Sequence, residues 1–111
     1  MLFLPELLAL DDAGFRDRFG TTAVARTKRI GLARNAAVVL GNTLNPAAIE
    51  PLGRALREDP SALVRAHAAW GLGRIGGPAA VKALDGTERR EPPPVEAEVA
   101  TARKTASASR Q

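Results

Sequence analysis

The chain has 111 residues, a formal net charge of +4 and no cysteine. Its length allows one small domain, and the lack of thiols excludes disulfides, thiolate zinc sites and cysteine-ligated iron–sulfur clusters within the chain. Hydrophobic residues make up 45% of the sequence but aromatic residues only 4%, which suits closely packed helices better than a β-sandwich.

Helix start and stop signals predict a series of short helices along the chain. The predicted helices span residues 2–10, 12–20, 23–30, 32–44, 46–57, 61–76 and 78–85. Pro46 and Pro78 each suit a first helical position, where their missing N–H costs nothing. Asp59-Pro60-Ser61 provides a cap, and Gly31 is expected to end the helix that precedes it.

After Thr87 the composition changes. Glu91-Pro92-Pro93-Pro94 cannot continue a helix, and Val95 to Ala102 allows only a weak one. Residues 105–111 offer nothing to bury, so we expect them to be disordered. The predicted organisation is a helical lead-in over residues 1–20, repeats over 21–86, and a disordered or weakly helical tail over 87–111.

One ungapped offset of 32 residues relates two parts of the chain. Ala36-Ala37-Val38-Val39-Leu40-Gly41 recurs as Ala68-Ala69-Trp70-Gly71-Leu72-Gly73, and Pro46-Ala47-Ala48-Ile49 recurs as Pro78-Ala79-Ala80-Val81. At the same offset, Leu52 recurs as Leu84. A period of this size with helical patterning is typical of stacked helix pairs.

Asp59 stands six residues before Arg65 in this repeat. The spacing resembles the HEAT-repeat pattern, in which an Asp in the turn and an Arg early in the second helix form a ladder between repeats. That resemblance implies a structural role for Arg65. We therefore predict an all-α fold, a short α-solenoid of two to three HEAT-like helix pairs with a disordered C-terminal tail.

Positive charge collects in the middle of the chain. Arg26, Lys28, Arg29 and Arg34 fall close together, with no acid between Asp17 and Glu50. A basic patch of this kind is the usual electrostatic signature of a polyanion partner. The alternative is an ordinary solvated helix face.

A second stripe of side chains runs along the predicted helix before Gly76. His67, Trp70 and Arg74 are spaced i, i+3 and i+7, away from the core positions. Their counterparts one repeat earlier are Asn35, Val38 and Asn42, beside Arg34. An indole flanked by a cation and an imidazole can stack bases and pair phosphates. The alternative is that Trp70 packs on an adjacent helix and His67 bonds a backbone carbonyl.

No catalytic constellation is visible, since the chain has one histidine and no cysteine. Asp11-Asp12 and Glu58-Asp59 are better explained as helix caps, and Gly71-Leu72-Gly73 lies inside a predicted helix rather than in a phosphate-binding loop. We expect no catalysis, cofactor or metal from this chain alone. The apolar opening is interrupted at Pro5, and no run reaches the ~20 residues of a membrane helix, so we expect a cytoplasmic protein without membrane contact.

Several segments together form a recognisable series. They are Phe15-Arg16-x-Arg18-Phe19, Gly20-Thr21, Arg26-x-Lys28-Arg29-x-Gly31-Leu32-x-Arg34-Asn35-Ala36, Leu40-Gly41-Asn42 and His67-Ala68-Ala69-Trp70-Gly71-Leu72-Gly73-Arg74. From about Leu4 to Leu84 the chain resembles the C-terminal HEAT-like domain of epoxyqueuosine reductase. That family performs the last step of queuosine synthesis in bacterial tRNA, with cobalamin and two [4Fe-4S] clusters. Its catalytic and ferredoxin-like parts precede this segment.

The resemblance implies a tRNA-binding accessory domain without the catalytic part. The implied partners are a tRNA anticodon stem-loop and a separately encoded or missing catalytic domain, because the family's cysteine ligands, cobalamin pocket and acid residue have no counterparts here. Phosphate contacts are predicted for Arg26, Lys28, Arg29 and Arg34, and contacts to sugars, bases or the catalytic part for Asn35, His67, Trp70 and Arg74. The alternative function is a HEAT-repeat scaffold that binds another protein.

Overall fold

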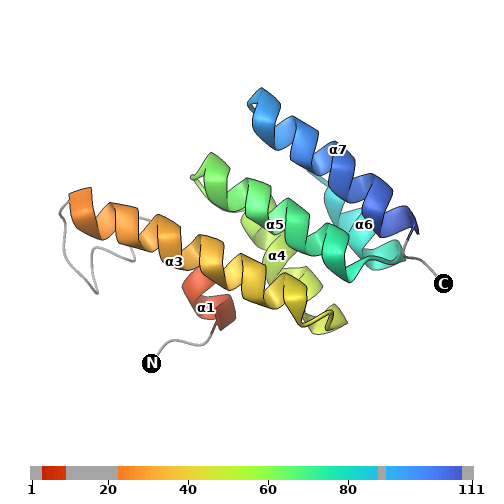
Figure 1. The fold of residues 1–111 in the computed structure, drawn as a ribbon, viewed down its shortest axis with the longest axis horizontal. Helices are drawn as coiled ribbons and strands as arrows, with labels where there is room; N and C mark the ends of the chain where they lie inside the picture. Colours follow the sequence, from red (N-terminus) through yellow and green to blue (C-terminus); the bar gives the residue numbers. More distant parts are fainter. Residues whose placement is uncertain (1–3, 10–22, 88–89, 109–111) are drawn as a thin grey trace.

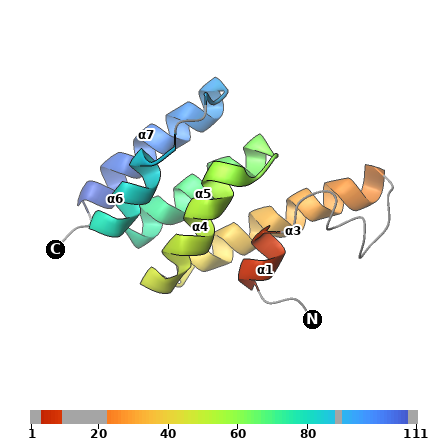
Figure 2. The ribbon, with the colours of Figure 1, turned by 180° about the vertical axis from the view of Figure 1, so that it is seen from behind.

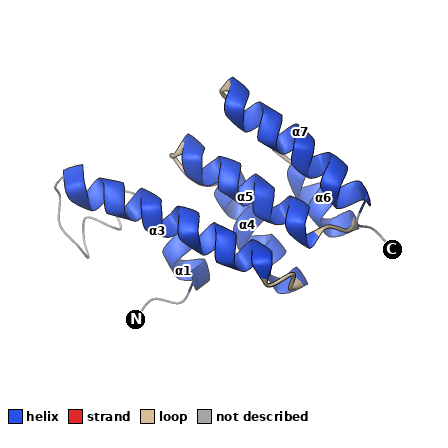
Figure 3. Cartoon of the chain, viewed as in Figure 1, coloured by secondary structure: helices blue, strands red, loops and turns tan. Residues whose placement is uncertain are grey.

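The computed structural model describes residues 4–9, 23–87 and 90–108. Every regular element in these ranges is helical (Figure 3). The elements are α1 (Leu4–Ala9), α3 (Ala23–Asn42), the short 3-10 helix η1 (Pro46–Ala48), α4 (Ile49–Glu58), α5 (Ala62–Ile75), α6 (Pro78–Asp85) and α7 (Pro93–Ala108). The helix predicted over residues 12–20 lies outside the described residues.

The helices form two layers. In one layer α3, α5 and α7 lie side by side (Figure 1), and in the other α1, α4 and α6 follow one another (Figure 2). Contacts across the layers join them into the successive pairs α1/α3, α4/α5 and α6/α7. The result is a thin slab of 44 × 30 × 16 Å, which confirms the predicted short stack of helix pairs.

Positions related by the 32-residue offset occupy equivalent places in the core. Leu52 of α4 and Leu84 of α6 are both completely buried, as are Ala37 of α3 and Ala69 of α5. Each helix buries its apolar side only against its neighbours in the stack, which is the energetic logic of a repeat protein. The sequence repeat is therefore a repeat of the packing.

Glycines let the helices of the α3, α5 and α7 layer approach closely. A Cβ at Gly41 would lie 2.7 Å from Gly71 Cα, where α3 meets α5. A Cβ at Gly73 would lie 2.9 Å from Ala102 Cα, where α5 meets α7. Real Cβ atoms essentially never come this near another backbone atom. The two helix contacts therefore depend on residues without side chains.

Gly31 does not end a helix, and this prediction was wrong. The helix α3 runs unbroken from Ala23 to Asn42. A glycine in a helix interior costs only about 1 kcal/mol, and the burial of Arg29 and Ala33 on either side of this position outweighs that cost. Among the described residues, leaving out those next to it along its own helix, no atom lies within 4 Å of a Cβ built at Gly31, so a side chain there would meet open space in this part of the structure.

Residues 93–108 of the tail form a helix, which corrects the prediction of disorder for residues 105–108. The helix α7 covers Pro93–Ala108 and packs on α5 and α6. The buried residues of this helix are Val95, Val99, Ala102 and Ala106. Their spacing of four, three and four residues is an apolar stripe. Sequence reasoning missed this stripe because two of its four residues are alanine, whose short side chain packs well only where a neighbouring helix comes close.

Candidate nucleic-acid interface

Arg29 lies inside the stack, which corrects its predicted role as a phosphate contact. Its side chain is 1% exposed and forms a forked ion pair with Asp59, Nη1 to Oδ2 at 3.2 Å and Nη2 to Oδ1 at 3.3 Å. Asp59 sits in the turn before α5, where it also accepts a 2.8 Å bond from the Ser61 amide. The turn acid thus reaches back to the preceding helix pair, and the arginine is not available to a ligand.

Arg65 repeats this arrangement one pair further along the stack. Its Nη1 donates to the Asp59 carbonyl oxygen at 2.8 Å, and its Nε and Nη2 bind the Glu91 carboxylate, each at 2.9 Å. Both Arg65 and Glu91 are buried. This confirms the predicted structural role of Arg65. We call the four residues Arg29, Asp59, Arg65 and Glu91 the inner ladder.

Sequence reasoning missed Glu91, although a signal for it was present. Glu91 stands 32 residues after Asp59, the offset of the repeat itself, and both occupy the turn before a helix of the same layer. The substitution of Glu for Asp and the three prolines that follow concealed the equivalence. The tail therefore completes the ladder as well as the stack.

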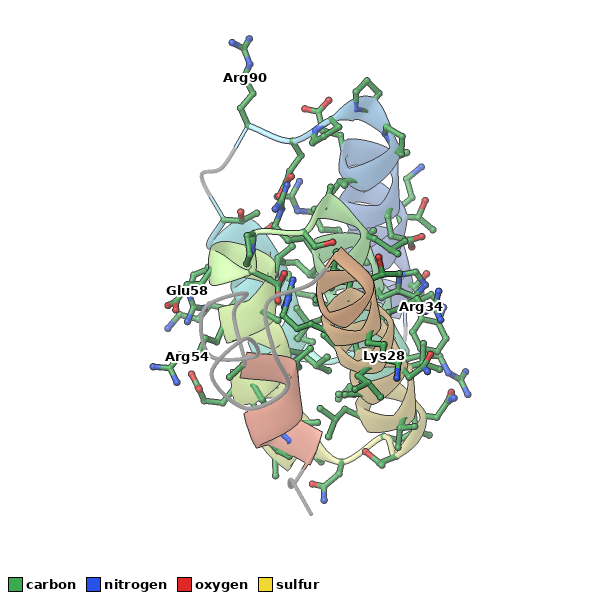
Figure 4. The ribbon with its side chains drawn as sticks, turned by 90° about the vertical axis from the view of Figure 1, so that its left-hand side faces the viewer. Lys28, Arg34, Arg54, Glu58 and Arg90 are labelled. Carbon is green, nitrogen blue, oxygen red and sulfur yellow. The ribbon has the colours of Figure 1, made fainter. Side chains whose placement is uncertain are left out.

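Two further basic residues of α3, Lys28 and Arg34, lie toward its exposed side. Lys28 is exposed, and Arg34 is half-buried with its Nε donating to Asn35 Oδ1 at 3.3 Å. In Figure 4 Lys28 and Arg34 lie on one side of the molecule, away from Arg54 on the α4 side. The backbone of Arg26 belongs to α3, while its side chain lies outside the described residues.

The α5 side chains His67, Trp70 and Arg74 include two that make structural contacts, and all three remain accessible to a ligand. His67 Nδ1 lies 2.9 Å from the Leu63 carbonyl oxygen, and a Cβ at Gly41 would lie 3.1 Å from Trp70 Cζ3, so the indole packs on α3. These are the structural contacts that the alternative predicted. Both side chains nevertheless remain half-buried rather than buried, and Arg74 is exposed, so all three are also accessible to a ligand.

A shallow groove brings residues of three helices together. It has a volume of ≈ 260 Å³, and its lining residues are Val38 from α3, Ala66, His67 and Trp70 from α5, and Glu98 from α7. The two stripes predicted from the repeat therefore do meet on one side of the layer. We call this exposed side of α3, α5 and α7, which carries Lys28, Arg34, Asn35, Val38, His67, Trp70, Arg74 and Glu98, the outer face.

Glu98 is a residue of the groove that sequence reasoning missed, because the tail was expected to be disordered or weakly helical.

In the described part of the chain, no group of His, Asp and Glu is arranged to hold a metal ion. Of the helices in these same ranges, none is long and apolar enough to cross a bilayer.

Comparison with known proteins gives the fold a family context. HEAT repeats match residues 22–102. Epoxyqueuosine reductase of Bacillus subtilis strain 168 is 30% identical over 88 residues, which is 79% of this chain and 23% of that protein. Epoxyqueuosine reductase of Xanthomonas campestris pv. campestris is 37% identical over 73 residues, 66% of this chain and 21% of that protein. The chain thus spans less than a quarter of the length of these reductases.

Solved structures agree with the sequence relatives. A crystal structure of selenomethionine-labelled epoxyqueuosine reductase is similar with a TM-score of 0.76 at 26% identity, covering 94% of this chain and 28% of that one. A crystal structure of epoxyqueuosine reductase with a tRNA-Tyr epoxyqueuosine-modified stem loop is similar with a TM-score of 0.74, again at 26% identity and with the same shares of the two chains. The resemblance to epoxyqueuosine reductase that the sequence predicted is confirmed.

Proposed function

We propose, from the premise that this chain belongs to the HEAT-repeat family, that it is a tRNA-binding accessory domain whose outer face holds an anticodon stem-loop. The observation that carries the proposal is that stacking sets the half-buried Trp70 of α5 beside Val38 of α3 in one groove. Lys28 and Arg34 of α3 lie together on one side of the molecule (Figure 4), and Arg74 follows Trp70 by one helical turn on α5. A reductase of similar fold binds a tRNA-Tyr stem loop, which supports RNA as the polyanion.

The chemistry of the outer face suits an RNA loop. Lys28 and Arg74 are exposed and form no ion pair with any residue that the structure describes. Each is therefore available to neutralise a phosphate and release its counterion. Trp70 adds an accessible ring, on which an unstacked base can lie.

The proposal assigns RNA binding and no redox step to this chain. A [4Fe-4S] cluster is held by thiolates, and the chain contains no cysteine, so its residues do not fit such a cluster. In this proposal a catalytic domain outside these 111 residues supplies the reductase chemistry. The accessory domain contributes affinity and orientation for the stem-loop.

The test is fluorescence anisotropy with a labelled anticodon stem-loop across a salt series. The double variant Lys28→Ala/Arg74→Ala removes two outer-face cations, and the control Arg54→Ala/Lys82→Ala removes two exposed cations from α4 and α6 in the other layer. We expect the first pair to weaken binding and to reduce the slope of log K against log salt by about two, roughly one for each lost phosphate contact. Equal losses from both pairs would mean attraction by net charge alone and would contradict the proposal.

A scaffold for another protein is the second candidate, and one observation favours it. Leu32 and Val39, spaced i, i+7 on α3, are 40% and 46% exposed, and apolar side chains of this kind suit a protein interface. The same salt series separates the two functions. Phosphate contacts weaken steeply as salt rises, whereas a chain that binds no RNA at low salt and captures a protein through Leu32 and Val39 would favour the scaffold.

A further inference from the structure

We infer that the groove beside Trp70 receives one unpaired guanine base of the bound RNA, with the Glu98 carboxylate accepting hydrogen bonds from its N1–H and N2–H groups. This inference rests on the proposed function and adds a base preference to it. It names a residue, Glu98, that neither the charge pattern nor the repeat points to.

The dimensions of the groove favour a single flat group. Its volume of ≈ 260 Å³ is below the roughly 300–1,000 Å³ of pockets that hold drug-sized ligands. Trp70 and Val38 supply aromatic and apolar surface on the α5 and α3 sides, while Glu98 lines the groove from α7. One ring system with polar groups along one edge matches this arrangement.

Glu98 is the reason to expect a base rather than a phosphate in the groove. It is a half-buried acid on a face whose other charged residues are Lys28, Arg34 and Arg74. It has no hydrogen bond or ion pair with any residue in the described ranges. A carboxylate repels phosphate oxygens but accepts from N–H donors with two oxygens. The cations therefore suit the backbone, and the groove suits an N–H edge.

His67 adds a second acceptor to the groove. A backbone carbonyl can only accept, so the 2.9 Å contact between His67 Nδ1 and the Leu63 oxygen requires a proton on Nδ1. In the neutral ring Nε2 then carries the lone pair and accepts. Glu98 and His67 together thus call for donors on the ligand.

Guanine is the base that meets this demand best. It presents two adjacent donors, N1–H and N2–H, which match the two oxygens of one carboxylate in a fork. Adenine and cytosine each present one amino group, and uracil one imino group. A carboxylate that accepts from a base edge in this way, with the ring against an aromatic side chain, is a recognised mode of reading unpaired RNA.

A guanidinium group from a protein partner would offer similar donors, but the surroundings disfavour it. Lys28, Arg34 and Arg74 on the outer face repel a basic peptide and attract a polyanion. The charge of the whole face therefore selects RNA, and the groove selects the base.

The chain carries its own reporter for this test, because Trp70 is its only tryptophan. Quenching of its fluorescence by the pentanucleotides UUGUU, UUAUU and UUIUU, at one low salt concentration, measures occupancy of the groove. Inosine lacks the 2-amino group, so UUIUU isolates that contact. We expect UUGUU to bind the full chain roughly tenfold more tightly than UUAUU, with UUIUU between them, as for loss of one good bidentate contact.

The variant Glu98→Gln should remove the guanine preference, since an amide presents only one acceptor oxygen. The control Glu96→Gln changes an exposed acid on the same helix with the same loss of charge and should keep the preference. Far-ultraviolet circular dichroism of both variants checks that the total helix content is retained.

Each other outcome overturns a specific statement. Equal affinities for the three RNAs, with salt-dependent binding of the stem-loop, would overturn the guanine groove and leave the proposed function standing. A uniform gain of affinity in Glu98→Gln would show that Glu98 only repels RNA. Quenching of Trp70 by a blocked arginine peptide but by no RNA would assign the groove to a protein. No binding of any RNA by the folded chain would overturn the proposed function itself.

Discussion

Lys28 and Arg29 are neighbours in the sequence, yet one side chain of α3 is exposed and the other is buried. Lys28 is exposed on the outer face, whereas Arg29 is 1% exposed and belongs to the inner ladder. The difference comes from the next helix pair, whose turn supplies Asp59 to one side of α3 only. A cluster of bases in a repeat protein is therefore not a binding site as a whole, because part of it serves the stack.

The same contrast recurs on α5. Arg65 points into the stack and binds Glu91, while Arg74 is exposed on the outer face. Two helices of one layer thus each divide their cations between an inner structural role and an outer one. Stability should respond to changes on the inner side, and ligand binding to changes on the outer face.

The largest expected effect breaks the inner ladder at Asp59. Asp59→Ala removes the carboxylate that the buried Arg29 binds in a fork, and removing one partner of a buried ion pair typically costs about 3–5 kcal/mol. The adjacent acid Glu58 pairs with Arg54 at 3.8 Å, with both side chains more than half exposed. Glu58→Ala should cost at most about 1 kcal/mol.

Chemical denaturation followed by circular dichroism measures both changes. A loss of native helix at zero denaturant in Asp59→Ala alone would be the extreme form of the expected result. If the two variants lost equally small amounts of free energy of unfolding, the inner ladder would not be what holds the helix pairs together.

A smaller effect is expected where α5 meets α7. Gly73→Ala places a Cβ 2.9 Å from Ala102 Cα, and overpacking of this kind costs typically about 1–3 kcal/mol. Gly31→Ala is the matched control, since no described residue of another element lies within 4 Å of that Cβ position. It should stabilise the chain by about 0.5–1 kcal/mol through helix propensity. Thermal unfolding of the two variants should therefore shift in opposite directions, and a shift in the same direction would refute the close contact.

The smallest effect on stability is expected from a change to an exposed cation of the outer face. Arg74→Glu changes an exposed residue that has no ion pair among the described residues, so its free energy of unfolding should change by no more than about 0.5 kcal/mol. Binding of the stem-loop should nevertheless fall by more than tenfold at low salt, because a phosphate contact becomes a repulsion. A variant that unfolds, or that binds like the original chain, would contradict the assignment of Arg74 to the outer face's RNA contacts.

Much of this architecture can be predicted from the sequence, because the same helix start signals and core positions occur in two copies of the repeat. The offset that pairs Leu52 with Leu84 gave the stack, and Pro46 and Pro78 located the starts of the helical segments they open. The Asp59-Pro60-Ser61 cap was also correct, with Ser61 as the residue that caps α5. These signals are local, so tertiary contacts were not needed to read them.

The wrong predictions concern features that tertiary packing determines. Gly31 carries a local stop signal, but the burial of Arg29 and Ala33 on either side carries the helix through it. Arg29 has the same chemistry as Lys28, and only the position of the next turn separates their roles. The alanines of α7 have short side chains, and they become buried because Gly73 lets α7 come close to α5. Charge and composition do not contain that information.

The most direct test of the two-sided account is amide chemical-shift mapping of the 11.7 kDa chain titrated with the anticodon stem-loop at low salt. The account predicts that perturbed amides cluster on the outer face around Lys28, Asn35, His67 and Arg74, together with the indole N–H of Trp70. Resonances of α4 and α6 should stay in place. Perturbation centred on α4 and α6, or none at all in a folded chain, would contradict it.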